Sequence, residues 1–162
     1  MTLVAVIADT HIPRGGRRLS SGCLEILARA DLILHGGDVT SGQVLEELRA
    51  LAPVHAVRGN MDDAELGASL PERFVHEVAG ARVGMVHDAG PRGGRAERLA
   101  AAFRGCDVVV YAHTHVPEVM RHEGIWIVNP GSPTERRSAQ TRSLATVRID
   151  ERGARPRLIA LP

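Results

Sequence analysis

Three short apolar runs alternate with two segments of helical spacing in the first 60 residues of the chain. The runs read "LVAVIAD" (3–9), "DLILHGGD" (31–38) and "VHAVRGN" (54–60), and their composition is typical of strands covered on both faces. The helical segments are "SSGCLEILARA" (20–30) and "SGQVLEELRAL" (41–51), each with Ser or Thr positioned to cap its start. Because strand–helix–strand alternation favours parallel pairing with right-handed crossovers, the sequence predicts an α/β fold.

The second half of the chain is richer in strands. Segments 73–78 and 82–88 flank "AGA" and predict a hairpin, and a helix is expected before a further strand over 107–113. A second hairpin over 118–129 and two terminal strands, "SLATVRID" and "ARPRLIALP", complete the pattern. We see no internal repeat, linker or low-complexity tract, so residues 1–162 are predicted to form a single domain with a mixed sheet system.

The composition argues against several classes of partner. A net charge of +1 and an aromatic content of 2% disfavour extended nucleic-acid contacts, which need a basic surface or stacking rings. No apolar run approaches the roughly 20 residues of a membrane span, and the first residues lack the basic region of a signal peptide. We therefore expect a cytoplasmic protein with no membrane partner. A homo-oligomer is compatible with the sequence.

Polar side chains stand where five of the predicted strands end. They are Asp9, His11, Asp38, Asn60, His87, His113 and His115. In open α/β sheets, residues just beyond the carboxyl ends of the strands converge on one crevice. The i, i+2 spacing of Asp9 and His11, and of His113 and His115, would place each pair on one side if the backbone stays extended.

The chemistry of this set points to metal ions. Two carboxylates, one carboxamide and four imidazoles suit Mn, Fe, Co, Ni or Zn, and they disfavour calcium or a structural zinc knot. Seven ligands exceed the need of one ion and fit two ions about 3.5–4 Å apart that share one carboxylate. The sequence therefore predicts a dinuclear site.

Each of these residues also has an ordinary interpretation. Gly59-Asn60 is common turn chemistry, and a lone His beside an apolar strand is more often a hydrogen-bonded structural residue than a ligand. These interpretations would have to hold at all five strand ends at once, so we favour the metal site. His35, just before Gly36-Gly37, is a candidate for supporting a ligand from behind.

The motifs "DTH" (9–11), "GGD" (36–38), "GN" (59–60), His87 and "HTH" (113–115), in this order, resemble those of the calcineurin-like metallophosphoesterases. The short chain, "GNMD" and "NPGSPTERR" resemble the small bacterial and archaeal phosphodiesterase branch, which also includes the eukaryotic retromer scaffold subunit. The resemblance implies a four-layer αββα sandwich with two mixed β-sheets, the fold of metal-dependent phosphatases.

The resemblance also implies how the ligands divide between the ions. One ion would be held by Asp9, His11 and His115, the other by Asn60, His87 and His113, and Asp38 would bridge them. The implied activity is phosphodiester hydrolysis, in which a hydroxide between the two ions attacks phosphorus. The ions are expected to be Mn foremost, with Fe, Zn, Co or Ni as alternatives.

One departure from the family pattern concerns the general acid. Larger members carry His directly after the metal-binding Asn, and that His is proposed to protonate the leaving group. Here the position is Met61, which has no proton to donate. Asp62 is a candidate substitute acid or water-orienting group, although it fits an exposed turn carboxylate as well.

Three further residues are candidates for contact with substrate. Arg14 and Arg58 lie close in sequence to the metal motifs and fit a phosphate contact, although surface arginine is the ordinary alternative. Ser132, in "NPGSP" (129–133), fits either the edge of the substrate site or a simple turn.

Two functions follow from this reading. The first is hydrolysis of a small phosphodiester, nucleotide-like or aryl, with Asp38, Asn60, His87 and Asp62 in the catalytic set. The second is a metal-binding protein-interaction scaffold with little or no hydrolytic activity. A nuclease is disfavoured by the near-neutral charge and the scarcity of aromatic residues.

Overall fold

The computed structural model describes residues 1–162 and contains two five-stranded mixed sheets. The first sheet has, from edge to edge, β10 (Gly153–Leu161), β9 (Arg142–Asp150), β1 (Thr2–Ile7), β2 (Leu32–His35) and β3 (Val54–Ala56). The second has β4 (Arg73–Val78), β5 (Ala81–Val86), β6 (Val108–Val110), β8 (Ile125–Asn129) and β7 (Glu118–His122). Strands β1, β2 and β3 are parallel to one another, as are β5, β6 and β8, while the other pairings are antiparallel.

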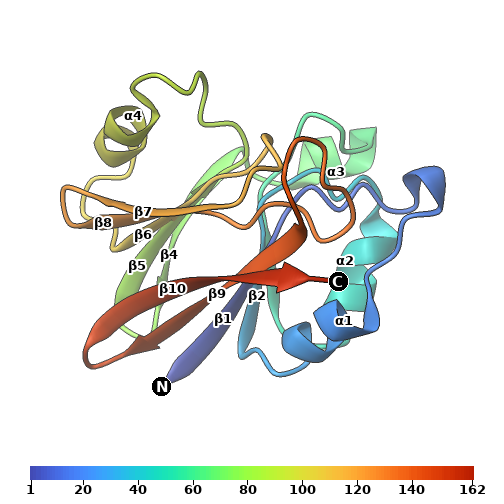
Figure 1. The fold of residues 1–162 in the computed structure, drawn as a ribbon, viewed down its shortest axis with the longest axis horizontal. Helices are drawn as coiled ribbons and strands as arrows, with labels where there is room; N and C mark the ends of the chain where they lie inside the picture. The colour runs from blue at the N-terminus through green and yellow to red at the C-terminus, as the bar shows by residue number, and fades with distance from the viewer.

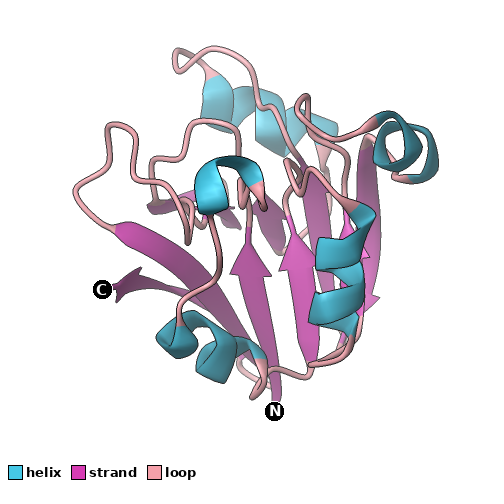
Figure 2. Cartoon of the chain, turned by 90° about the vertical axis from the view of Figure 1, so that its right-hand side faces the viewer, coloured by secondary structure: helices cyan, strands magenta, loops and turns pink.

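The sheets pack face to face and helices cover their outer faces, so the chain has the four layers expected (Figures 1 and 2). The helices are α1 (Ser21–Leu27), α2 (Gly42–Arg49), α3 (Ala64–Ser69) and α4 (Arg95–Ala102). One buried apolar cluster lies between the sheets and draws on strands of both. A second cluster joins the first sheet to α1 and α2, and a third joins the second sheet to α4.

The observed elements confirm the predicted order and add one helix. Helix α3 follows the "GNMDD" stretch, and Asp63 caps it by accepting a hydrogen bond from the Leu66 amide at 2.8 Å. Only Leu66 of this helix is buried, so the segment lacks the apolar spacing that identifies a helix in a sequence.

Several strands end earlier than their apolar patterns suggest. Strand β1 stops at Ile7, two residues before Asp9, and β6 stops at Val110, three residues before His113. The predicted ligands therefore lie in loops beyond the strands. Because these loops follow the carboxyl ends of parallel strands, they gather at one end of the sandwich.

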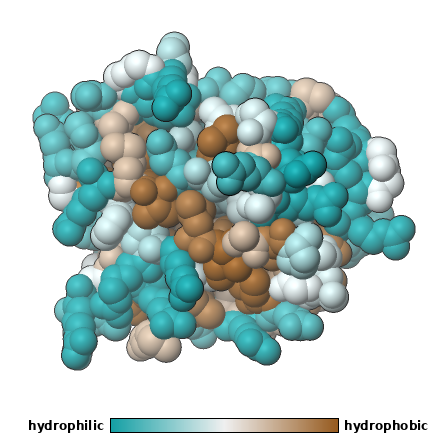
Figure 3. Space-filling model, viewed as in Figure 1, coloured by the Kyte–Doolittle hydropathy of each residue, from teal (hydrophilic) through white to brown (hydrophobic).

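The surface seen in Figure 3 carries a central patch of apolar residues surrounded by hydrophilic ones. On this side the edge strands β7 and β10 of the two sheets approach each other. Val119 and Leu158 are partly buried there against the cluster between the sheets. None of the helices has the length and apolar character needed to cross a bilayer.

Gly84 in β5 leaves the space that the ring of Phe103 occupies. A Cβ at Gly84 would lie 2.4 Å from Phe103 Cδ1, well inside contact distance. We expect Gly84→Ala to lower the free energy of unfolding by about 1–3 kcal/mol, because overpacking displaces a buried ring. Urea denaturation measures this.

Gly67→Ala in α3 is the matched control, since a Cβ at Gly67 meets nothing within 4 Å. Alanine is favoured over glycine inside a helix by about 0.5–1 kcal/mol, so this variant should be neutral or slightly more stable. Equal stability of the two variants would show that Phe103 does not pack as described.

Candidate metal centre

Two clusters of side chains face each other beyond the strand ends. The first consists of Asp9, His11 and His115, all buried. The Nε2 atoms of His11 and His115 lie 3.3 Å apart, and His115 Nε2 lies 3.6 Å from Asp9 Oδ1. Their ligand atoms thus surround one point, as the ligands of a single ion do.

The second cluster brings together Asn60, His87 and His113, with Asp38 beside them. Asn60 Oδ1 lies 3.0 Å from His87 Nε2 and 3.0 Å from His113 Nδ1. The two imidazole nitrogens are 3.3 Å apart. His87 is buried and Asn60 is exposed, so this cluster is open to solvent on one side.

Asp38 lies between the two clusters. Its Oδ2 is 3.5 Å from His11 Nε2 in the first cluster and 3.6 Å from His87 Nε2 in the second. Its other oxygen, Oδ1, accepts a hydrogen bond from the Met61 amide at 2.8 Å. One carboxylate oxygen therefore faces both clusters, as a ligand shared by two ions would.

The backbone at these positions is not extended. The expectation that each i, i+2 pair lies on one side required extended backbone. Five of the residues have positive φ: Asp9 (53°), His11 (47°), Asp38 (56°), His113 (69°) and His115 (59°). Asp9 and His11 share a cluster, whereas His113 and His115 belong to different clusters. Left-handed non-glycine residues cost on the order of 1–3 kcal/mol each, and such strain is concentrated at functional sites.

Two glycines permit the close approach of the loops. A Cβ at Gly59 would lie 2.1 Å from Asp38 Oδ1, and a Cβ at Gly37 would lie 2.7 Å from His87 Nδ1. Gly37 also has a φ of +95°. The "GGD" and "GN" motifs thus contain glycine because side chains at these positions would occupy the space of the predicted ligands.

Hydrogen bonds behind the clusters set the orientation of two imidazoles. His87 Nδ1 donates to the Gly36 carbonyl at 2.8 Å, which leaves the lone pair of Nε2 facing the second cluster. His35 accepts from the Gly37 amide through Nδ1 at 3.2 Å, so its Nε2 donates to Thr10 Oγ1 at 3.1 Å. His35 therefore ties the first strand end to the second, and burial lowers its pKa to about 3.

The electrostatics of the clusters favour a bound cation. Burial, and then the charge of Asp38, raise the pKa of Asp9 well above its usual value. Burial likewise lowers the pKa of His115 to about 4. Asp9 Oδ1 is buried and has no hydrogen-bond partner. A divalent ion would offset the repulsion between the carboxylates and satisfy this oxygen, so the residues present fit a metal.

Ser132, for which a substrate contact and a simple turn were the two alternatives, lies behind the centre. It is buried, and its hydroxyl donates to the Asp9 carbonyl at 2.8 Å. Thr134 does the same for the Thr10 carbonyl at 2.8 Å, while Asn129 donates to Thr114 Oγ1 at 3.0 Å. The "NPGSPT" segment thus fastens the loops that carry the first cluster. Side chains of Asn, Ser and Thr commonly form hydrogen bonds to backbone groups, so their presence in this segment is the feature of the sequence that could have indicated the supporting role.

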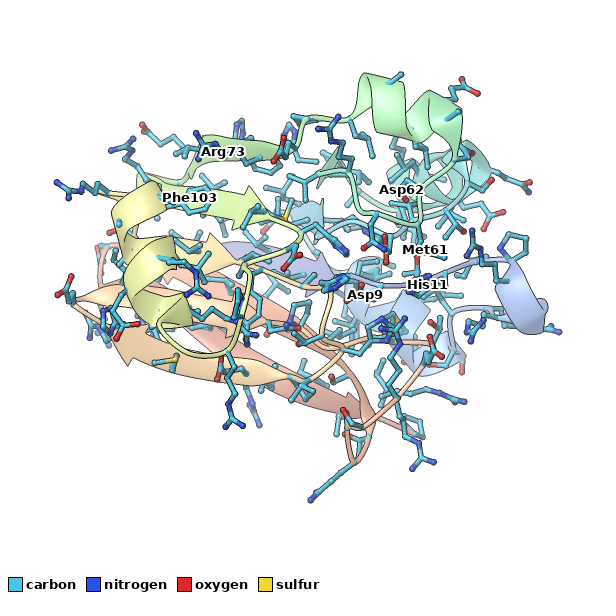
Figure 4. The ribbon with its side chains drawn as sticks, turned by 90° about the horizontal axis from the view of Figure 1, so that it is seen from above. Asp9, His11, Met61, Asp62, Arg73 and Phe103 are labelled. Atoms are coloured by element: carbon cyan, nitrogen blue, oxygen red, sulfur yellow. The ribbon has the colours of Figure 1, made fainter.

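Asp62 fastens a loop in the same way. Its Oδ1 accepts from the Thr40 amide at 2.8 Å and its Oδ2 from the Gly59 amide at 2.6 Å. Both oxygens are thus engaged with backbone, and Figure 4 shows Asp62 set back from Asp9 and His11. Asp62 is better placed to hold Gly59 in position than to donate a proton to substrate.

The two candidate arginines take different positions. Arg14, in a 3₁₀ turn (Arg14–Gly16), donates to the Met61 carbonyl at 3.5 Å. Arg58 pairs with Glu72 at 3.1 Å and lines an open depression of about 330 Å³ next to Asn60 and His87. Arg58 therefore lies beside the second cluster, whereas Arg14 lies against the backbone of Met61.

Glu135, within "NPGSPTERR", was not among the predicted site residues but lies next to the first cluster. Its Oε2 lies 3.8 Å from His115 Nδ1, on the side of the ring away from Asp9. It also pairs with Arg17 at 3.1 Å. This carboxylate stands in the position from which a ligand imidazole is commonly supported.

Comparison with known proteins identifies relatives over most of the chain. Residues 1–152 match the calcineurin-like phosphoesterase superfamily domain. A probable metallophosphoesterase of Methanothermobacter thermautotrophicus is 39% identical over 150 residues, covering 91% of this chain and 86% of that protein. A probable metallophosphoesterase of Methanocaldococcus jannaschii is 38% identical over 135 residues, covering 82% of this chain and 68% of that protein.

The fold is shared with solved structures. Wild-type Vps29 from Entamoeba histolytica, crystallised as a complex with Zn²⁺, matches with a TM-score of 0.78 at 25% identity. The match covers 98% of each chain. The two-sheet architecture described above is therefore that of a known group of proteins.

We expect divalent metal to stabilise the protein strongly. An ion present at 100 times its dissociation constant adds about 2.7 kcal/mol to the free energy of unfolding. Since 1 kcal/mol shifts the Tm of a domain of this size by about 2–4 °C, two Mn²⁺ ions should raise the Tm by on the order of 10 °C. Calorimetry with excess Mn²⁺ or with EDTA measures the difference. Identical Tm values in the two conditions would contradict the assignment.

Gly59→Ala serves as the matched variant in this experiment. The new methyl group would displace the Asp38 carboxylate, so the rise in Tm caused by Mn²⁺ should fall by at least half. Gly67→Ala, where a Cβ has open space, should retain the full rise.

Proposed function

The chain belongs to the calcineurin-like phosphoesterase superfamily, and from this premise we propose that it hydrolyses small phosphodiesters with the help of two divalent metal ions. The observation that carries the proposal is Asp38 Oδ2, which faces both ligand clusters at 3.5 and 3.6 Å. A single carboxylate shared between two groups of imidazoles is what a two-metal phosphoesterase requires.

The metal ions would supply the main chemistry, by polarising the phosphoryl oxygens and making bound water more acidic. The chain supplies the charge and the geometry around them. Asp9 and Asp38 contribute −2 against +4 from two divalent ions, which leaves a charge of +2 to attract an anionic diester. The imidazoles and Asn60 add ligands without adding negative charge.

Orientation of the ligands is fixed before substrate arrives. The Gly36 carbonyl holds the ring of His87, the Met61 amide holds Asp38 Oδ1, and the His113 amide donates to Asp9 Oδ2 at 3.1 Å. Such fixed donors and acceptors need little reorganisation during the reaction, which is the main source of electrostatic catalysis.

Expulsion of the leaving group receives little help from the chain. The side chain after Asn60 is the exposed thioether of Met61, which cannot donate a proton. The carboxylate of Asp62 is engaged by two backbone amides. We therefore infer a preference for diesters whose leaving groups depart as stable anions.

For the ions we propose Mn²⁺ first, with Fe, Zn, Co or Ni as alternatives. The set of oxygen and nitrogen ligands without thiolate supports this range. The Zn²⁺ complex of Entamoeba histolytica Vps29 shows that a protein of this fold accepts zinc.

The second candidate function is a metal-binding scaffold for other proteins. The similarity of the fold to that of Vps29 is compatible with this function. The complete set of seven ligand residues favours the enzyme instead, because a scaffold has no need of an open cluster at Asn60 and His113.

A phosphoester panel tests the two functions against each other. Aryl and nucleotide diesters, with matching monoesters and an oligonucleotide, should be assayed with each of the five metals. We expect turnover of small diesters with Mn²⁺, and loss of that turnover in Asp38→Ala, which rules out a contaminating enzyme. Bound metal without turnover of any ester would favour the scaffold, and cleavage of the oligonucleotide alone would favour a nuclease.

The dependence on leaving group is a separate expectation. General acids contribute about 10²–10⁴-fold to such reactions, so kcat should fall by a comparable factor from 4-nitrophenyl to alkyl leaving groups. Single-turnover rates across phenols of graded pKa measure the slope. If these rates vary little while the chemical step limits turnover, an acid is at work that Met61 does not supply.

A further inference from the structure

Each sheet has two edge strands, and three of these four edges are protected against pairing with a further strand. Strand β10 carries Pro156 in its middle, which has no N–H to donate. Strand β7 lies against β10, and β3 has only three residues. Strand β4 differs, because it runs for six residues (Arg73–Val78) without proline and without a bulge in its register with β5. It is the one long open edge of the two sheets.

The hydrogen bonds of β5 show which backbone groups of β4 point to the open side. Glu77 lies opposite Arg82 of β5. The Arg82 amide donates to the Asp107 carboxylate at 2.8 Å, and the Arg82 carbonyl accepts from the Asp107 amide at 2.8 Å, so both groups point away from β4. Antiparallel strands alternate between hydrogen-bonded and non-hydrogen-bonded pairs. The amides and carbonyls of Arg73, Val75 and Glu77 therefore point to the open edge.

The side chains of these three residues are also without partners. Arg73 and Glu77 are exposed, and neither forms an ion pair within the chain. Val75, midway between them, is one of the few large apolar residues that are exposed. Phe74 and Val78, in contrast, pack against the apolar cluster between the sheets. The open edge thus presents an apolar residue flanked by two opposite charges.

We propose that the open edge of β4 pairs with β4 of a second copy of this chain, antiparallel and centred on Val75. In this register Val75 lies opposite Val75 of the second copy, and Arg73 lies opposite its Glu77. The pairs so formed are of the hydrogen-bonded kind, so every open amide and carbonyl of the three residues finds a partner. The contact joins the second sheets of two chains into one, and it does not depend on the hydrolytic function.

Charge complementarity selects both the second copy and this register. A two-fold axis at Arg73 or at Glu77 would bring like charges face to face. An axis at Phe74 or at His76 would place Val75 opposite a charged residue. Only the axis at Val75 pairs opposite charges and joins an apolar residue to its equal, and such cross-strand pairs stabilise a sheet. The contact is isologous and closes with two copies, because it occupies the open edge of each.

A depression of about 320 Å³ borders the edge and gives room for the second strand. Phe74, Val75 and His76 of β4 line one side of it, and Val54 and His55 of β3 line the other. In the proposed register Phe74 lies opposite His76 of the second copy, on the side of the strand that faces this space. No element of the same chain pairs with β4 there.

Charge reversal tests the register. In analytical ultracentrifugation the Mn²⁺-loaded wild-type chain should reach twice the mass of one chain as its concentration rises. Glu77→Arg should raise the dissociation constant of this dimer by about tenfold or more, because the two-fold axis repeats the new like-charge contact. Adding Arg73→Glu to the same chain restores opposite charges across the contact and should restore the wild-type constant. Mixing the two single variants should likewise give a heterodimer, although each alone is monomeric.

Glu25→Arg is the matched control, since Glu25 is an exposed residue of α1 without an ion pair and the change in charge is the same. This variant should dimerise as the wild type does. A wild-type chain that stays monomeric at every concentration would overturn the proposal and leave the edge to a strand of another protein. A dimer that responds alike to Glu77→Arg and Glu25→Arg would overturn it as well, because the contact would then lie elsewhere.

A cross-link tests the position of the two-fold axis. The Cα atoms of a hydrogen-bonded antiparallel pair lie about 5.5 Å apart, within the range of roughly 4.4–6.8 Å that a disulfide spans. Mild oxidation should therefore join Val75→Cys chains into a covalent dimer, while the native Cys23 and Cys106 are buried. Val116→Cys is the control, because Val116 is 43% exposed and Val75 is 46% exposed. Equal cross-linking of the two variants would contradict an axis at Val75.

Discussion

The burial of two carboxylates against each other is the constraint on which the rest of the structure depends. Asp9 and Asp38 are both almost fully buried, and the charge of Asp38 adds to burial in raising the pKa of Asp9. The surrounding imidazoles do little to offset the repulsion between the two carboxylates. Burial lowers the pKa values of His11 and His115 and so favours their neutral forms. Neutral donors around two buried acids form a poor environment for charge unless a cation is present. The clusters therefore make physical sense as the two halves of one metal centre.

The loops that carry these residues are held in strained conformations by bonds from elsewhere in the chain. Ser132 and Thr134 bind the carbonyls of Asp9 and Thr10, more than 120 residues away in sequence. His35 joins the first and second strand ends, and Asp62 holds the backbone around Gly59. These bonds offset the cost of left-handed backbone at the ligand positions. The supporting residues matter for the centre although they do not face it.

Much of the fold and the identity of the clustered residues could be predicted from the sequence, for a simple physical reason. Strands covered on both faces are apolar, so a charged or imidazole side chain at their ends stands out. Asn60, taken by itself, would be interpreted as a turn residue. It is a ligand candidate because nitrogens of His87 and His113 converge on its amide oxygen. Helix α3 was missed because its single buried residue leaves no apolar period.

Other features of the centre depend on loop conformations that apolar patterns do not encode. Nothing in the spacing shows that His113 and His115 face different clusters, because Asp9 and His11 have the same spacing and share one cluster. The inward direction of Ser132 and the backbone contacts of Asp62 are likewise set by tertiary packing.

The central claim is that Asp38 is shared by two ions. A crystal structure of the Mn²⁺-loaded protein, with anomalous data at the manganese edge, tests it most directly. The account predicts two anomalous peaks about 3.5–4 Å apart, with Asp38 bound to both. A single peak, or two peaks of which only one contacts Asp38, would contradict it.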